Sequence, residues 1–422
     1  MAHNADPAAA PLAPRAAWRV RILALVSVLG PGLLAGLSDD DPAGITTYSV
    51  LGAQHGYQLL WVLLLSTIAL VVFHSLGARM GVVTGQGLIG LIRQRYGVRA
   101  ALLAVAVLIV ANIGTTCAEF AGIAAGFELF GVSRYASVPL AAVVVSMLVL
   151  RGSFHRVEHL LMALATVFVA YIAAGLLANP DWSQALAGLV VPTMPLTRDA
   201  VLIATATVGT TLAPWGLSFI QSYAVDKKLT VADLRYEQID VITGAVLTGV
   251  IGFFVVVACA STLHVQGVTI NSAADAAGAL KPLAGNLASA LFGVGLIGAA
   301  LLAAAILPLS TAYSVCEFTG SEAGLDDKIA DASLFYLTYL IVTGVAALIV
   351  LLPGAPLIPI LILSQVLNAV LLLPLLAFMY GISRDRDLMG AYTATRTSAA
   401  LYLAIIAFIT VCIAALFMLS LT

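Results

Sequence analysis

Charged residues are scarce in this sequence. Only 9% of its 422 residues are Asp, Glu, Lys or Arg, while 61% are hydrophobic. The mean hydropathy of +1.06 is too high for a water-soluble core to explain. The net charge of −2 provides no basic surface of the kind that binds nucleic acid. The composition therefore predicts an integral membrane protein that contacts lipid and has no nucleic-acid partner.

Several patterns that carry chemistry are also missing. The four cysteines lie far apart, within or at the ends of apolar runs, so they predict neither a disulfide framework nor a ligand cluster. No Gly-x-x-x-x-Gly-Lys-Ser/Thr run is present, which argues against the use of ATP. We find no nucleophile–base arrangement and expect neither an enzyme nor a bound cofactor. Four histidines are interpreted as hydrogen-bonded or surface residues: His55, His74, His155 and His159.

Apolar runs dominate the chain, and eleven of them are long enough to span a bilayer at about 20 residues each. They predict an all-α integral membrane protein with eleven transmembrane helices. The segment 81–97 is shorter and carries arginines at its end, so we expect an interfacial or cytoplasmic piece there. The predicted spans lie at about 22–53, 57–80, 100–130, 136–151, 157–178, 199–225, 238–263, 284–314, 332–353, 356–381 and 397–420.

The distribution of Lys and Arg predicts the orientation. With a cytoplasmic N-terminus, all but three of the 19 Lys and Arg residues fall on the cytoplasmic side, the exceptions being Arg134, Arg198 and Lys281. Eleven spans then place the C-terminus outside the cell (plasma) membrane. Residues 1–20 are predicted to be a cytoplasmic tail, and residues 382–422 a cytoplasmic loop and the eleventh helix.

The first apolar run is interrupted by the sequence SDDDPAGITT at residues 38–47. Three carboxylates lie here where a spanning helix should be most apolar, and each charge near the bilayer centre costs a few kcal/mol on insertion scales. Pro42 and Gly44 are expected to break the helix and to free backbone carbonyls. We expect the helical pattern to resume at about Ile45. Acidic side chains beside free carbonyls favour a cation site.

The sixth run repeats this interruption with the sequence TVGTTLAPWG at residues 207–216. Five predicted helices separate the two breaks. Interrupted helices at matching positions in two halves are typical of an inverted five-plus-five repeat, with the substrate held between the breaks. The halves would be residues 21–178 and 199–381 of a core at 21–381. The alternative is that each break is an ordinary proline kink.

Short motifs along the chain resemble the Nramp family of divalent-metal transporters, which have a LeuT-like fold. Residues 41–44 (DPAG) are similar to the family's first-helix Asp-Pro-Gly-Asn, and residues 213–215 (APW) to its sixth-helix Met-Pro-His. Residues 118–122 (AEFAG) are similar to the family's third helix. Residues 364–366 (SQV) and 373–374 (LP) are similar to its tenth helix, and residues 387–390 (DLMG) to the loop before its eleventh helix.

The resemblance implies a metal site at Asp41, but with two of the family's side-chain ligands missing. Gly44 stands at the position of the family's Asn, and Ala213 at the position of its Met. Loss of the soft thioether favours Mg²⁺ or Mn²⁺ over softer metals, and water ligands can fill the vacated positions. The chain is thus most similar to the Nramp-related branch that carries magnesium. Asp40 and Gln365 are further candidate ligands for the transported cation.

Proton coupling is expected to be weak or absent. The family's sixth-helix His corresponds to Trp215, and Thr116 stands where the family has a third-helix Asp. Glu119 is retained in the third helix. We therefore consider Glu119 and Trp215 as candidates for a proton-handling or gating role.

Other interpretations stay open at this point. One alternative is that Asp41 has only a structural role, as a helix cap. Another is that Gln365 and Asn368 are amides that bridge helices and bind no cation. A carrier of a small organic solute is a second functional hypothesis, favoured by the aromatic Trp215. A sensor or scaffold without transport is a third, although the carboxylates at 39–41 would then only destabilise the protein in the membrane.

Overall fold

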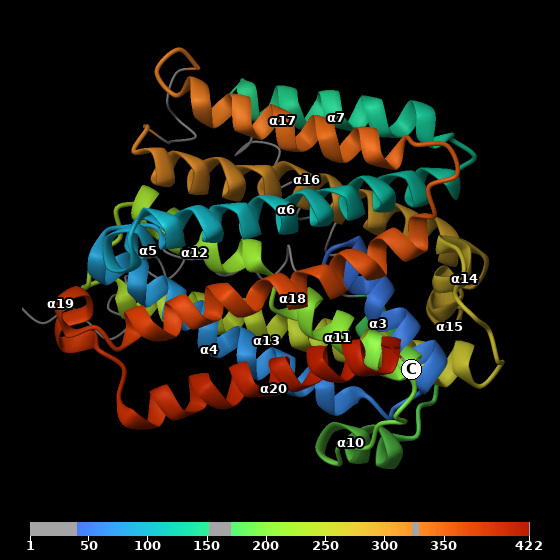
Figure 1. The fold of residues 1–422 in the computed structure, drawn as a ribbon. Coiled ribbons are helices and arrows are strands. Elements are labelled where there is room, and N and C mark those ends of the chain that lie inside the picture. The colour runs from blue at the N-terminus through green and yellow to red at the C-terminus, as the bar shows by residue number, and fades with distance from the viewer. Residues whose placement is uncertain (1–39, 152–169, 323–328, 422) are drawn as a thin grey trace, which may run out of the picture.

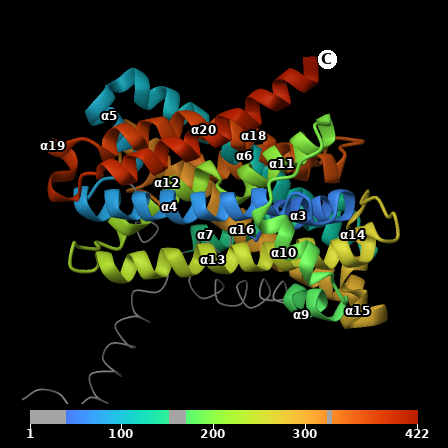
Figure 2. The same cartoon turned by 90° about the horizontal axis from the view of Figure 1, so that it is seen from below.

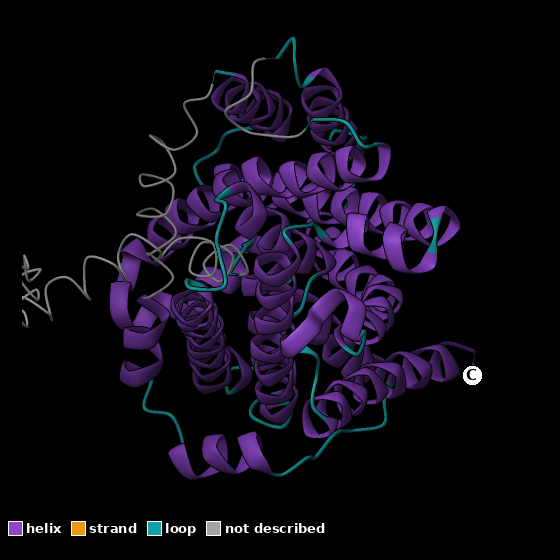
Figure 3. Cartoon of the chain, turned by 90° about the vertical axis from the view of Figure 1, so that its left-hand side faces the viewer, coloured by secondary structure: helices purple, strands orange, loops and turns teal. Residues whose placement is uncertain are grey.

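The computed structural model describes residues 40–151, 170–322 and 329–421, which form helices joined by loops and contain no strand (Figures 1 and 3). The predicted first half of span 22–53 and most of span 157–178 lie outside these residues. The all-α prediction is confirmed for the part of the chain that the structure describes.

Within those ranges, eight helical segments are long and apolar enough to cross a membrane, and one further apolar helix is shorter. Each corresponds to one of the predicted spans. The eight are α4 (Leu60–Thr84), α6 (Val98–Glu128), α11 and α12 (Arg198–Thr211 and Pro214–Asp226), α13 with the π-helical turn η2 (Leu234–Cys259 and Ala260–His264), the segment Ala273–Thr319 that ends in α16 (Ala288–Thr319), α17 (Ser333–Val350), α18 (Leu357–Ser383) and α20 (Arg396–Leu421). The shorter one is α7 (Arg134–Leu150).

The described part of the first span is α3 (Pro42–His55), and that of the fifth is α9 (Ala170–Leu177). The remaining short elements connect the spans and lie at their ends. They are α5 (Leu88–Tyr96), α10 (Trp182–Val190), α14 (Ala273–Ala277), η3 (Gly278–Leu280), α15 (Lys281–Ala284), η4 (Gly285–Leu287), α19 (Arg386–Met389) and η5 (Gly390–Tyr392).

The segment predicted to be interfacial begins within helix α4. Helix α4 continues through residues 81–84 and ends where Gly85 adopts the left-handed conformation, with φ of 64°. The short helix α5 follows and buries one apolar face, which includes Leu88 and Ile92. The prediction therefore placed the end of the second span too early.

The helices fall into two groups in Figure 1. Helices α7 and α17 lie beside each other and pack against the pair α6 and α16, while α3, α4, α11, α13 and α18 form the other part of the bundle. Figure 2 shows that α20 and α13 lie on opposite faces of α4. Helix α3 is packed between α6, α11, α13 and α18, so the first break lies inside the bundle.

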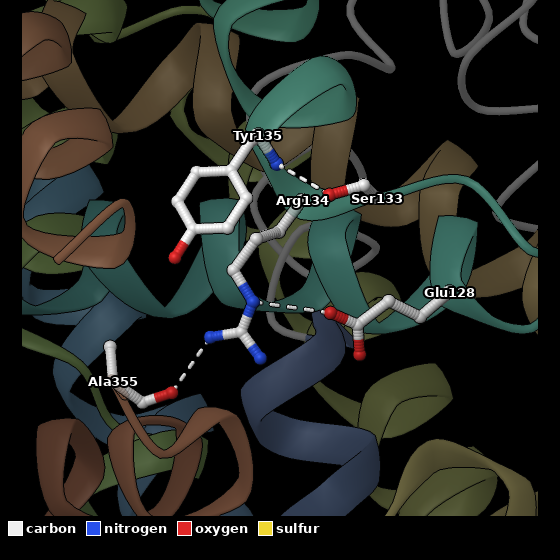
Figure 4. A network of polar contacts seen from close by, with 5 residues as sticks. All are labelled: Glu128, Ser133, Arg134, Tyr135 and Ala355. Atoms are coloured by element: carbon white, nitrogen blue, oxygen red, sulfur yellow. Dashed lines mark hydrogen bonds and ion pairs between the residues drawn. The ribbon is translucent and has the colours of Figure 1, made fainter. Parts of the chain in front are cut away.

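The two ends of the bundle are held by different ion pairs. At the end with α5 and α19 (Figure 1), Arg95 Nε lies 2.8 Å from an Asp385 carboxylate oxygen. At the opposite end, Arg134 donates to Glu128 Oε1 at 3.2 Å and to the Ala355 carbonyl at 2.8 Å (Figure 4). These contacts fix the loop between α6 and α7 against the loop that precedes α18.

Candidate functional site

The first break lies immediately before α3. Asp41 is the N-cap of this helix, and its carboxylate Oδ1 accepts a hydrogen bond from the backbone N–H of Gly44. Pro42 occupies the first helical position, where a missing N–H costs nothing. The prediction that the helix resumes at Ile45 was wrong, because α3 already begins at Pro42. Gly44 therefore lies inside the first turn and does not break the helix.

The second break separates α11 from α12. Helix α11 ends at Thr211, Leu212 and Ala213 follow in non-helical conformations, and Pro214 starts α12. Because Pro214 has no N–H, it cannot donate the helical hydrogen bond that the Thr210 carbonyl would otherwise accept. The predicted interruption of the sixth span is thus confirmed. At the first, the structure shows that α3 begins at Pro42, and the residues expected to form the preceding helix lie outside the described ranges.

Carboxyl groups gather at the first break. Asp40, Asp41 and Glu119 of α6 are exposed by 2%, 4% and 0%. Glu119 lies close enough to Asp41 for their charges to interact. The close approach of α6 depends on Gly122, since a Cβ there would overlap the ring of Pro42. The structure therefore brings three acidic side chains from two elements into one buried region.

These carboxyl groups are short of partners. Both side-chain oxygens of Asp40 and both of Glu119 are buried without a hydrogen-bond partner among the described residues. Buried polar groups in proteins are nearly always satisfied, and a buried charge without a partner is costly. Glu119 also lies within hydrogen-bonding reach of the Asp41 carboxyl, so a proton shared by these two carboxyls, a cation or water can satisfy the oxygens. Asp39, the remaining acidic residue of this run, lies outside the described residues.

After α11 ends, the second break is lined mainly by apolar side chains, while the Thr210 hydroxyl in the last turn of α11 is buried without a hydrogen-bond partner among the described residues. Ala213 and Trp215 are each exposed by 2% and belong to one buried cluster that includes Ala43 of α3 and Ala118 of α6. The Trp215 ring packs against Phe219 with centroids 6.1 Å apart. The polar contact at Trp215 is made by its backbone carbonyl, which accepts from Ser310 Oγ at 3.2 Å. Trp215 and Ala213 thus offer packing surface and no side-chain ligand.

Gln365, a predicted ligand, takes part in a polar network within the bundle. Its amide nitrogen donates to Ser364 Oγ at 3.0 Å, and its amide oxygen accepts from Asn368 at 3.0 Å. Asn368 also donates to Thr115 Oγ1 of α6 at 2.9 Å. This is the helix-bridging arrangement considered in the sequence analysis. In this arrangement the Gln365 amide joins α18 to α6 through Asn368.

One hydrogen bond joins the helices of the two breaks, another joins α6 to α16, and the sequence analysis predicted neither pair. Tyr48 of α3 shares a 2.9 Å hydrogen bond with Thr211 at the end of α11. Asn112 of α6 donates to Thr311 of α16 at 2.8 Å. A detectable signal existed on α6, where polar residues at 112, 115, 116 and 119 recur at helical spacing along one face. The partners Tyr48 and Thr311 had no such signal.

No set of three His, Cys, Asp or Glu side chains in the described ranges is arranged to hold a metal ion. Among the described residues, a cation at the first break would find at most two such side chains together, with backbone oxygens or water as further ligands. This arrangement differs from a closed structural metal site, which supplies four protein ligands.

A family model described as natural resistance-associated macrophage protein-like matches residues 32–419. The chain belongs to the Nramp family. Among its Nramp relatives, the divalent metal cation transporter MntH of Granulibacter bethesdensis is 27% identical over 396 residues, covering 90% of this chain and 85% of the relative. MntH of Pectobacterium carotovorum is 29% identical over 384 residues, covering 86% of this chain and 87% of the relative.

Solved structures show the same fold as this Nramp chain. The manganese transporter of Eremococcus coleocola superposes with a TM-score of 0.78 at 18% identity, covering 97% of this chain and 88% of the other. The nucleobase-cation-symport-1 family transporter Mhp1 superposes with a TM-score of 0.58 at 15% identity, covering 93% of this chain and 91% of the other. The LeuT-like fold is therefore confirmed. The protein is a multi-pass membrane protein of a transporter family rather than an enzyme.

Proposed function

We propose that this protein carries a divalent metal cation across the cell membrane by alternating access, with the cation bound beside the first break. The observation that carries the proposal is the set of buried carboxyl oxygens at Asp40 and Glu119 that lack partners beside Asp41. Relatives named as divalent metal cation transporters support the same substrate class. The cation is the substrate, and no resident cofactor is required.

We propose further that hard cations, Mg²⁺ or Mn²⁺, are preferred over softer metals. The site offers carboxylates at the first break, whereas Ala213 and Gly44 contribute no side-chain ligand atom. Oxygen ligands suit Mg²⁺ and Mn²⁺, and Mg²⁺ in particular retains several waters when it binds. This preference would place the chain in the magnesium-type branch of the family.

Transport is proposed to be uncoupled from protons or only weakly coupled. Trp215 carries no titratable group into the second break. Thr116 uses its hydroxyl to donate to the Asn112 carbonyl at 2.6 Å, within its own helix. Glu119 is the titratable side chain of α6 that remains beside Asp41. A coupled mechanism could use these carboxyl groups, or the buried imidazole of His74, whose Nε2 lies against Gly216 beside the second break and has no hydrogen-bond partner among the described residues.

The orientation is proposed from the arginines. Helices α5 and α19 lie at one end of the bundle and carry Arg93, Arg95 and Arg386 (Figure 1). Arg134 and Lys281 lie toward the other end, together with the C-terminus. By the positive-inside rule the end with α5 is cytoplasmic and the C-terminus is outside.

The alternative, a carrier of small organic solutes, relied on Trp215 as a stacking surface. The burial of Trp215 against Phe219 leaves little of the ring open to a solute. The metal hypothesis is therefore the better supported of the two.

Purified protein in liposomes tests the proposal directly. We expect Mg²⁺ and Mn²⁺ to enter faster than in protein-free liposomes, as measured with an entrapped metal-sensitive dye. Uptake of neither ion, together with calorimetric binding of an organic solute, would refute the proposal.

A further inference from the structure

The seam between α12 and α16 is held by hydrogen bonds between side chains. Ser218 of α12 shares a 2.9 Å hydrogen bond with Ser314 of α16. Tyr313 of α16 donates from its hydroxyl to an Asp226 carboxylate oxygen of α12 at 3.2 Å. Hydroxyl groups that separate can exchange such bonds for bonds to water, whereas apolar surfaces that separate lose the free energy of their burial. The seam is therefore of a kind that can open and close.

Glu317, near the C-terminus of α16, joins three elements at the end of this seam. Its Oε1 accepts a hydrogen bond from Ser222 Oγ of α12. Its Oε2 accepts from the backbone N–H of Ile89 at 3.2 Å, and the N–H of Gly90 lies within hydrogen-bonding reach of the same carboxylate. Both N–H groups belong to the first turn of α5, where unpaired donors and the helix dipole favour a carboxylate. The side chain thus caps α5 and holds α12 at the same time.

The chain before α5 leaves room for this carboxylate. A Cβ at Gly87 would overlap the Glu317 carboxyl group. The backbone of Gly87 has a φ of −73°, which any residue can adopt, so the glycine is required by this contact and not by the turn. Arg93 of α5 donates to the Phe318 carbonyl at 2.7 Å and so attaches α5 to the end of α16. Glu317 and α5 therefore form one side of the seam.

Helix α12 forms the other side. It begins at Pro214 after the non-helical residues Leu212 and Ala213, so no continuous helix couples it to α11. Helices α5 and α12 lie at the same end of the bundle (Figure 1). A cavity of about 400 Å³ lies there, and its lining includes Ser222 and Glu317. Helix α12 can therefore tilt at the second break, and its far end has space beside it.

We propose that the hydrogen bond from Ser222 to Glu317 is a latch, which holds α12 against α5 and α16 in this conformation and breaks when this end of the protein opens. Helix α5 positions the carboxylate, and Ser222 is the group that leaves it. The Ser218–Ser314 pair joins two helices, whereas the latch joins three elements. The proposal rests on alternating access, as in the proposed function, and not on the identity of the transported cation.

The distance between two spin labels measures the separation that the latch controls. The labels are attached to cysteines in place of the exposed residues Gln94 of α5 and Lys227 at the end of α12, and Cys412, the native cysteine that is not fully buried, is replaced by serine. In metal-free protein in nanodiscs, we expect Ser222→Ala to raise the population at a longer distance about tenfold, because a hydrogen bond to a carboxylate is lost. Glu317→Ala should do at least as much, and Glu317→Gln, which keeps one acceptor oxygen, should do less.

Gly87→Ala tests the latch without removing a hydrogen-bonding group. The added methyl group should displace the Glu317 carboxyl group and raise the same longer-distance population. Because both substitutions break one contact, Gly87→Ala should change the population less than about twofold when Ser222→Ala is already present. Thr319→Ala is the control, since this hydroxyl bonds within α16 and to Ser321 and not to α12. It should leave the distances unchanged.

Identical distance distributions in Ser222→Ala and the unmodified protein would overturn the latch, as would effects of Gly87→Ala and Ser222→Ala that simply add. Ser222→Ala decides the matter even if Gly87→Ala does not fold. The measurement needs no metal, so it is separate from the uptake assay. Normal uptake with unchanged distances would overturn the latch alone. The expected distance change in a protein that takes up neither Mg²⁺ nor Mn²⁺ would support the latch and contradict the proposed substrate.

Discussion

The break before α3 and the break between α11 and α12 each place a proline at the first position of a helix, but their surroundings differ. The first break is surrounded by carboxyl groups whose oxygens lack partners. The second is surrounded by Ala213, Trp215 and Phe219 in a dense apolar cluster. A proline at the first helical position is therefore found at both breaks, beside carboxyl groups at the first and beside packed apolar side chains at the second. Under the proposed function, we expect the first break to determine whether a cation binds and the second to determine which cation is preferred.

The largest effect is expected from Asp41→Ala, which should reduce metal uptake to the level of protein-free liposomes. The substitution removes a carboxylate from the first break together with the α3 cap, and loss of a cap costs about 0.5–2 kcal/mol. Asp41→Asn separates the two roles, because Asn caps helices about as well as Asp but carries no charge. If Asp41→Asn transports normally, the charge of Asp41 is not required for transport, because the Asn amide oxygen can still bind a cation. Uptake is measured in proteoliposomes at equal protein content.

Trp215→Ala should destabilise the protein by about 3–5 kcal/mol, the usual cost of removing a large buried aromatic side chain. The reason is the loss of packing in the apolar cluster at the second break. Trp215→Phe, the matched control, keeps an aromatic ring beside Phe219 and should lose much less. Thermal unfolding in detergent compares the two variants. Equal stability of Trp215→Ala and the unmodified protein would show that the second break is loosely packed, contrary to its burial.

Ala213→Met should shift selectivity by about tenfold toward Mn²⁺ or Cd²⁺ over Mg²⁺, because it adds a soft thioether to the second break. Competition between the metals during uptake gives the ratio. Ala213→Leu has a similar size without sulfur and serves as the control. A shift of the same size in the Leu variant would attribute the effect to volume, and the contrast between the two breaks would then not rest on ligand chemistry.

The smallest signal is expected for protons. With the membrane potential clamped and a pH-sensitive dye entrapped, metal uptake should cause little or no acidification of the liposomes. The second break has no titratable side chain at Trp215, and Thr116 is uncharged. Acidification that follows metal entry and disappears in Asp41→Ala would show that a carboxyl group of the first break carries the proton, so that this break would serve both ions.

The sequence was most informative where a residue type has a high free-energy cost in a membrane-spanning helix. Aspartates in an apolar run and a proline in the middle of a span located both breaks, because lipid imposes strict requirements on charge and backbone hydrogen bonds. The similarity of residues 118–122 to the third helix of the family also pointed to Glu119. The exact start of α3 was missed, because proline is equally suited to end one helix and to begin the next.

Tertiary partners were beyond the reach of the sequence. Nothing near Tyr48 indicates that its hydroxyl meets Thr211, which lies 163 positions away in the chain. Gln365 has the chemistry of a cation ligand, and only the structure shows its amide bound to Ser364 and Asn368. His264 is likewise 211 positions from Ala53, and its Nδ1 lies 2.9 Å from the Ala53 carbonyl oxygen because η2 returns to the end of α3.

Gly209 limits how this protein can vary in evolution. Helix α11 crosses α18 so closely that a Cβ at position 209 would overlap the Gln365 carbonyl and crowd the Ala369 nitrogen, and backbone atoms cannot turn aside as a side chain can. Even alanine is therefore excluded at this position unless the two helices separate. In relatives, a larger residue here should be accompanied by a changed spacing of these helices. Position 209 is thus a marker by which family members that share this helix crossing can be recognised from sequence.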